Sequence, residues 1–347
     1  MAQASQAEAK MMGRGMELHL LLLSLSLVGA WISWSSEGEA PETEDPVLIW
    51  DLGDSAIQSI HFKSEKLKVK MSARKDKGGI DFLWAHSERV ASAVQNDDAQ
   101  KGATPIKKSF RVSRTGAQKA LDGFKKLSAQ RDLGVLSAEK LKSFKLDPPH
   151  AEINLESANE SFSLSVGMQA HGANLRYVCL KERSCFVMKG GLIDDLKWAD
   201  SRLYERNLFH ATKKEITEIN LECRNKKLGW KRPYDEKAAD GVDNWKNSEK
   251  STEADSSINP QKWLNQIFRI RVVHYQDPET SFESYLRTEL KTQDGKTRTI
   301  DLARDGEGEG SRYMARSEHS EVWVEMSNFL GKEMGEDIES LCGGREP

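Results

Sequence analysis

This sequence has little net charge and few cysteines, and each of these features excludes a class of protein. Its 51 Lys and Arg residues nearly balance 54 Asp and Glu residues, which leaves a formal net charge of −3. No overall positive field attracts nucleic acid, so we expect no nucleic-acid partner. The four cysteines form no C-x-x-C pair and no zinc-finger spacing, which excludes the usual cysteine-rich metal modules.

Motifs of common metal and nucleotide enzymes are missing as well. None of the eight histidines belongs to an H-E-x-x-H motif, and the glycine-rich stretch at 306–310 lacks the Lys-Ser/Thr pair of a phosphate loop. The pattern His-Ser-Glu occurs at 86–88 and again at 319–321. Two ligands per copy do not complete a metal site. We therefore expect no metal and no cofactor.

One stretch, VLIWDLGDSA at 47–56, resembles the nucleophile block of a lipase family. A serine hydrolase needs a histidine base, which that family supplies from an Asp-x-x-His pair near the carboxyl terminus. The pair with this spacing, Asp147 and His150, instead lies in a predicted turn far from that end. We interpret Asp54 and Ser55 as turn residues and expect no catalytic residue.

A long hydrophobic run stands near the amino terminus. Residues 18–34 contain no Asp, Glu, Lys or Arg. A helix of this length spans roughly 25 Å, the short end of what a bilayer core requires. Lys10 and Arg14 precede the run, and an acidic linker at 35–46 follows it. This asymmetry predicts a transmembrane anchor at 18–34, with the tail 1–17 in the cytoplasm and the remaining chain outside.

A cleaved signal peptide is the alternative interpretation of the same run. Val28-Gly29-Ala30 has the small residues of a cleavage site. Trp31 and Trp34 favour the anchor, because amphipathic rings prefer the membrane interface. With the anchor, the protein is a single-pass inner-membrane protein whose carboxyl-terminal region lies in the periplasm. With cleavage, it is periplasmic or secreted.

Beyond the linker, two stretches of the chain show one order of predicted elements. In both 47–210 and 211–335, strands lead to a helix, a short second helix, a β-meander and a final helix. We predict an α+β fold in which the transmembrane helix precedes two tandem similar domains, each an antiparallel sheet with packed helices. Residues 336–347 are expected to form a flexible tail.

The spacing of apolar and capping residues places these helices. Apolar residues three to four apart predict one helix at 117–127 and its counterpart at 263–273. A capping residue followed by an acid predicts short helices after Ser137 and after Asp277. Asp294-Gly295, between two alternating stretches, predicts a hairpin in the second meander.

Each predicted domain also carries an Arg-Tyr pair at the start of a hairpin: Arg176-Tyr177 in the first and Arg312-Tyr313 in the second. One interpretation is a repeated contact with an anion or a partner. The other is that each arginine extends over the sheet while the tyrosine packs beneath it. Cys179 and Cys185 flank the tip of the first hairpin. They form either a cross-strand disulfide, in an oxidising compartment, or two half-buried thiols.

Four stretches carry a resemblance to a known family: LGVLSAEKLKSFKLDPPHAEINL (133–155), FSLSVGM (162–168), LRYVCL (175–180) and, more weakly, DLKWAD (195–200). They resemble an uncharacterised bacterial family known as domain of unknown function 4340, with the second domain as a weaker copy. Lys145 stands where that family usually has glycine. Its motifs are turns and strands, so the resemblance implies a fold and supplies no catalytic residue. Family members look like single-pass envelope proteins, some of them associated with transporter components of gliding-type systems.

Together these observations predict a non-enzymatic, membrane-anchored accessory or scaffold protein of the bacterial cell envelope. Its expected partners are the inner membrane, through residues 18–34, and envelope proteins, such as those of an ABC-type transporter or a gliding-type system. The alternative is an envelope hydrolase or carbohydrate-active enzyme with a site between the two repeats. A concave site with convergent ionisable side chains would favour that alternative.

Overall fold

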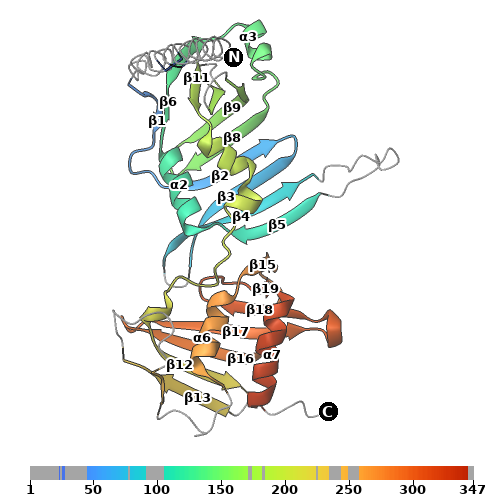
Figure 1. Ribbon diagram of the computed structural model, residues 1–347. Coiled ribbons are helices and arrows are strands. Elements are labelled where there is room, and N and C mark those ends of the chain that lie inside the picture. The colour runs from blue at the N-terminus through green and yellow to red at the C-terminus, as the bar shows by residue number, and fades with distance from the viewer. Residues whose placement is uncertain are drawn as a thin grey trace, which may run out of the picture.

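Two antiparallel sheets, one after the other along the chain, make up most of the structure (Figure 1). The computed structural model describes these residues: 23, 26–27, 45–76, 79–90, 105–170, 174–181, 184–223, 226–233, 244–248 and 258–342. The fold is rich in strands, with few helices, in the manner of an α+β protein.

The first sheet has nine strands in the order β5-β4-β3-β2-β8-β9-β10-β11-β7. Their bounds are β2 (Ile57–Ser64), β3 (Leu67–Lys75), β4 (Asp81–Arg89), β5 (Ile106–Arg111), β7 (Arg131–Val135), β8 (Ala151–Ser157), β9 (Ser161–Gln169), β10 (Leu175–Leu180) and β11 (Ser184–Lys189). The same domain contains the strand pair β1 (Val47–Asp51) and β6 (Lys126–Ala129), and the helices α2 (Arg114–Lys125), α3 (Ala138–Ser143), α4 (Gly191–Lys197) and α5 (Ala199–Arg202).

The second sheet has eight strands in the order β14-β13-β12-β16-β17-β18-β19-β15. Their bounds are β12 (Ile216–Cys223), β13 (Lys226–Lys231), β14 (Lys246–Asn247), β15 (Val272–Tyr275), β16 (Ser284–Thr292), β17 (Thr297–Asp305), β18 (Arg312–Ser317) and β19 (Val324–Met326). The helices α6 (Pro260–Arg269) and α7 (Asn328–Cys342) lie over one face of this sheet (Figure 1). The 3₁₀ turn η1 (Lys213–Glu215) precedes β12, and η2 (Gly308–Gly310) lies between β17 and β18.

The two sheets have the same strand order over eight positions. If β2 is matched with β12, then the run β4-β3-β2-β8-β9-β10-β11-β7 corresponds to β14-β13-β12-β16-β17-β18-β19-β15. Each run also has a helix, α2 or α6, before its last edge strand, and another, α4 or α7, after its meander. The first domain adds the edge strand β5, the β1–β6 pair and the helices α3 and α5.

Each of the two main helices, α2 and α6, begins after a capping residue. The side-chain oxygen of Ser113 accepts a hydrogen bond from the Gly116 N–H at 3.2 Å, and that of Asn259 accepts from the Lys262 N–H at 2.7 Å. Both helices end earlier than predicted, because Leu127 belongs to β6 and Val273 to β15. In each case the chain changes to an alternating or β-branched stretch that suits a strand better than a helix.

Of the two short second helices, only the first forms. The predicted helix after Ser137 is α3, whereas the chain after Asp277 makes one turn, with the Thr280 N–H bonded to the Asp277 carbonyl at 2.9 Å. Phe282 then packs edge-on against Trp323 at 5.8 Å, and β16 begins two residues later. This tertiary contact overrides the local helix signal.

Both predicted ends of the second domain need correction. Leu208 and Phe209 are buried in the core of the second domain, so its start lies before the predicted boundary at residue 210. At the other end, α7 continues through the predicted boundary at 335, and Ile338 in the supposed tail is only 4% exposed within the same core.

The membrane prediction falls largely outside the described residues. The structure describes nothing of 1–17, only Leu23, Ser26 and Leu27 of the predicted anchor 18–34, and only the last two residues of the linker 35–46. Among the residues that it does describe, no helix has both the length and the apolar character needed to cross a membrane.

Candidate functional site

Aromatic side chains join the two domains. Tyr204, which follows α5, stacks on Phe110 with ring centroids 5.1 Å apart and meets Tyr275 edge-on at 5.4 Å. Tyr275 in turn meets Trp84 of the first sheet at 5.6 Å. Burial raises the pKa of Tyr204 to about 12 and that of Tyr275 well above its ordinary value, so both stay neutral donors.

Hydrogen bonds from the Tyr275 hydroxyl and from the buried Arg111 stabilise this junction. The Tyr275 hydroxyl donates to the Glu205 carbonyl oxygen at 3.1 Å. Arg111, at the end of β5, is 4% exposed, and its guanidinium lies 3.9 Å from the ring centroid of Phe82. It pairs with Asp76 at 3.7 Å, and its Nη1 donates to the carbonyl oxygen of His319 in the second domain.

Beside this arginine, three potential ligands converge: Glu205, His210 and His319. One ligand atom from each lies within 4.8 Å of the other two. The carboxylate of Glu205 is 3% exposed, and its Oε2 is 3.4 Å from Nε2 of His210. The rings of His210 and His319 meet edge-on with centroids 4.4 Å apart. Glu205 and His210 come from the connector between the domains, and His319 from the turn between β18 and β19.

The protonation states of the cluster are set by its surroundings. Burial opposes ionisation of Glu205, but hydrogen bonds from His210 and from the Asn207 N–H outweigh it, and the pKa of Glu205 is lowered. Burial, together with the nearby charges of Arg111 and His210, lowers the pKa of His319 to about 3. At neutral pH the site therefore offers a carboxylate and a neutral imidazole side by side.

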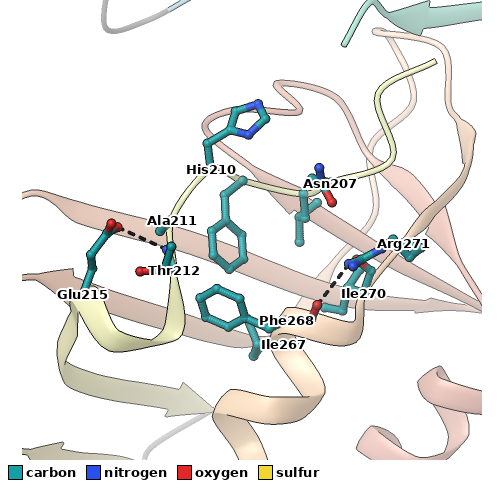
Figure 2. A pocket seen from close by; sticks show the side chains of 11 residues that line it. Asn207, His210, Ala211, Thr212, Glu215, Ile267, Phe268, Ile270 and Arg271 are labelled. Carbon is teal, nitrogen blue, oxygen red and sulfur yellow. Dashed lines mark hydrogen bonds between the residues drawn. The ribbon is translucent and has the colours of Figure 1, made fainter. Parts of the chain in front are cut away.

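The cluster opens into a cavity of about 420 Å³ between the two domains. Charged and ionisable groups in its wall come from both domains: Asp76, Asp81, Arg111, Arg114, His210, Arg298, Glu318 and His319. His210 also borders a second cavity, of about 450 Å³, between the connector and the end of α6. Figure 2 shows that the His210 ring points away from Phe268 and Glu215 of that second cavity. Its imidazole contacts Glu205 and His319 at the interdomain cavity.

The predicted contact residue Arg176 lies elsewhere, on the helix-covered face of the first sheet. Its side chain, 13% exposed, pairs with Asp194 of α4 at 2.8 Å. Its neighbour Tyr177 points to the opposite face, where it stacks on Phe144 with ring centroids 4.0 Å apart and planes at 4°.

The second Arg-Tyr pair is oriented the other way round. Tyr313 packs into the core beneath α7, next to Gly331, and Arg304 lies over its ring at 5.6 Å. Arg312 turns away from that core and pairs with Asp305. The structure therefore does not bring the two pairs together, and they are not equivalent, because each tyrosine occupies the face that the other domain gives to arginine.

Arg176 lines a pocket of about 310 Å³ at one end of the first sheet. Four cationic side chains, Lys66, Arg89, Arg176 and Lys197, face two acids, Glu65 and Asp194, and Trp198 forms part of the wall. Burial lowers the pKa of His150 in the same wall, and the positive charges of Lys197, Arg176 and Lys145 lower it further. Because Asp200 pairs with Arg89 and Asp194 pairs with Arg176, the pocket keeps one net positive charge, from Lys66 and Lys197 against Glu65.

The other sequence candidates are resolved by strand register. Cys179 and Cys185 face each other across β10 and β11 and form a disulfide, with Cα atoms 4.0 Å apart.

Strand register also excludes a catalytic role for the lipase-like block at 47–56. β2 pairs with β8 from Ile57↔Ser157 to Ser64↔Ala151. Ser55 and His150 thus lie at opposite ends of the pair, about 20 Å apart, and cannot share a proton.

Sequence reasoning singled out His319 but missed its two neighbours. The pattern His-Ser-Glu at 86–88 suggested a partner in the first domain, yet His86 bonds Ser109 through Nδ1 at 2.8 Å and takes no part in the cluster. Glu205 and His210 lie in the connector, where no periodic pattern marks them. Their closeness to His319 depends on how the domains dock.

No family model, no curated protein and no solved structure matches the chain. The resemblance to the uncharacterised bacterial family therefore stays a prediction.

Proposed function

We propose that this protein is a membrane-anchored accessory subunit of the bacterial cell envelope, built from two copies of one domain, that binds an acidic segment of a partner protein. The observation that carries the proposal is the electropositive pocket around Arg176. Its role is recognition, and the protein is not an enzyme.

The pocket has the composition of a contact surface. Lys66 and Lys197 are exposed and make no ion pair with another described residue. Trp198 at the rim is 44% exposed, and Arg89 lies over its ring at 5.4 Å. Exposed tryptophan and arginine are the side chains that most often dominate binding energy at protein interfaces.

The proposed location rests on the amino-terminal sequence and on the disulfide. The apolar run at 18–34 would anchor the chain in the inner membrane and place the two domains in the periplasm. The Cys179–Cys185 disulfide fits that compartment, because structural disulfides persist where thiols are oxidised. The common strand order of the two sheets supports duplication of one domain, and the resemblance to domain of unknown function 4340 supports an association with a transporter or gliding-type system.

Pull-down of the full-length protein in mild detergent tests this function. We expect the wild type to retain envelope proteins, and the double variant Lys66→Glu with Lys197→Glu, or Trp198→Ala, to lose them. Lys291→Glu with Lys332→Glu makes the same change of charge on exposed residues of the second domain and should retain them. Equal retention by all variants, or no membrane-complex component with any of them, would refute the proposal.

The interdomain cavity favours a second candidate function, an envelope hydrolase or carbohydrate-active enzyme. A carboxylate, two imidazoles and a buried arginine converge there, which is the arrangement that an active site requires. Turnover of ester and glycoside substrates by the full-length protein, abolished in His210→Ala but not in Lys66→Glu, would establish this function in place of the first.

A further inference from the structure

The three side chains at the domain junction have the chemistry of a metal site. We propose that Glu205, His210 and His319 bind one divalent transition-metal ion, of which Zn²⁺ is the best match, between the two domains. The sequence led us to expect no metal, because each His-Ser-Glu pattern supplies only two ligands, and nothing in the sequence marked Glu205 and His210 as the partners of His319. The site is independent of the partner-binding pocket at Arg176.

The distances suit zinc. Bonds of about 2.0–2.1 Å in a tetrahedral site place neighbouring ligand atoms roughly 3.3–3.4 Å apart. Oε2 of Glu205 and Nε2 of His210 are already 3.4 Å apart, and all three ligand atoms lie within 4.8 Å of one another. His210 is exposed, so its side chain has room to adjust to an ion.

His319 has a nitrogen that needs a partner. Its Nε2 is buried and accepts or donates no hydrogen bond among the described residues. A buried polar atom without a partner costs about 1–3 kcal/mol. A metal ion would satisfy this atom.

The local charge favours a cation despite the nearby arginines. Four carboxylates surround the site, namely Glu205, Asp76, Glu318 and Glu321. Two guanidinium groups oppose them: Arg111, which pairs with Asp76, and Arg298, which pairs with Glu318 at 3.5 Å. Asp81 and Arg114 in the same wall cancel each other, so the balance is negative by two charges, which a divalent ion would neutralise.

Outer contacts hold two of the ligands in place. The Asn207 N–H donates to Oε1 of Glu205 at 2.8 Å, which leaves Oε2 directed at His210. Arg111 holds the backbone of His319 from the first domain. Such outer partners orient metal ligands and are worth roughly 10–100-fold in metal affinity.

Three protein ligands leave one position of a tetrahedral ion open. His210 and His319 both line the interdomain cavity of about 420 Å³, so that position would face it. Water, or an oxygen atom of a small ligand, fits there. This is the arrangement of zinc sites that exchange ligands, whereas purely structural zinc sites are closed by four protein ligands.

Zn²⁺ titration of the full-length protein in detergent, after removal of metals with a chelator, tests the site. We expect one Zn²⁺ per chain by calorimetry, and Co²⁺ should give the visible absorption of a tetrahedral ion with nitrogen and oxygen ligands. His210→Ala should weaken binding at least tenfold. Because its side chain is exposed, this variant should stay folded. Glu205→Gln should weaken binding similarly, with folding checked by circular dichroism.

His274→Ala is the matched control, because it removes an exposed histidine of β15 that is not part of the cluster. It should bind Zn²⁺ like the wild type. Absence of stoichiometric binding, or the same affinity in His210→Ala, His274→Ala and the wild type, would overturn the proposal. Loss of Zn²⁺ binding in His210→Ala with unchanged retention of envelope partners would leave the proposed function intact.

Discussion

At the scale of single residues, Asp301 shows how the second sheet accommodates a buried charge. Its side chain is 7% exposed on β17, where it faces Arg287 of β16 and Arg316 of β18 in register. Burial opposes its ionisation, but hydrogen bonds from Arg287 at 2.8 Å and Arg316 at 2.9 Å outweigh it, and the pKa of Asp301 is lowered. One carboxylate thus links three neighbouring strands.

Asp301→Asn should lower the free energy of unfolding by about 1–3 kcal/mol at pH 7, because it removes the charge that both arginines need. The folded pKa of Asp301 lies below its unfolded value. Its ionic contribution is therefore present above about pH 4 and is lost as the pH falls through the folded pKa. Urea unfolding at pH 7 and pH 3 should show the difference from wild type shrinking at the lower pH. Asp305→Asn, which alters a more exposed pair with Arg312, should cost less than about 1 kcal/mol.

At the scale of elements, strand register decided what the sequence could and could not predict. Periodicity placed the meanders and the Asp294-Gly295 hairpin, where Gly295 has a φ of 80° that glycine tolerates. It could not show which face each strand buries. A shift of one residue exchanges the two faces of a strand. For that reason the matching residue pairs Arg176-Tyr177 and Arg312-Tyr313 lie in opposite environments.

The helix α7 can pack closely on the ring of Tyr313 because Gly331 lies at the point of contact. A Cβ atom at Gly331 would lie 2.2 Å from Cγ of that ring, whereas one at Gly335 would lie 3.5 Å from its nearest ring atom. Gly331→Ala should therefore destabilise the protein by about 1–3 kcal/mol, because α7 or the ring must shift. Gly335→Ala in the same helix should be neutral or stabilise it by up to about 1 kcal/mol through helix propensity. Thermal unfolding of the two variants compares them directly, and equal effects would contradict this packing.

For the whole molecule, the order of elements was predictable and the docking of the domains was not. Each domain buries its own core, and local patterns report such burial. The junction is made of side chains that no local pattern connects: Arg111 ends an edge strand, Glu205 lies in the connector, and His319 lies in a distant turn. Because the interdomain cluster exists only when both domains are docked, no stretch of sequence contains its signal.

Tyr275 should couple the unfolding of the two domains, because its ring packs against both cores and its hydroxyl bonds the connector. Tyr275→Ala removes its edge-on contacts with Trp84 and Tyr204, which lie at the junction of the two domains. We expect it to cost about 2–4 kcal/mol and to split one calorimetric transition into two. Tyr275→Phe keeps the ring contacts and loses only the hydrogen bond, so a single transition about 1 kcal/mol less stable is expected. If Tyr275→Ala unfolds in one transition like the wild type, the domains are held together by contacts other than this aromatic junction.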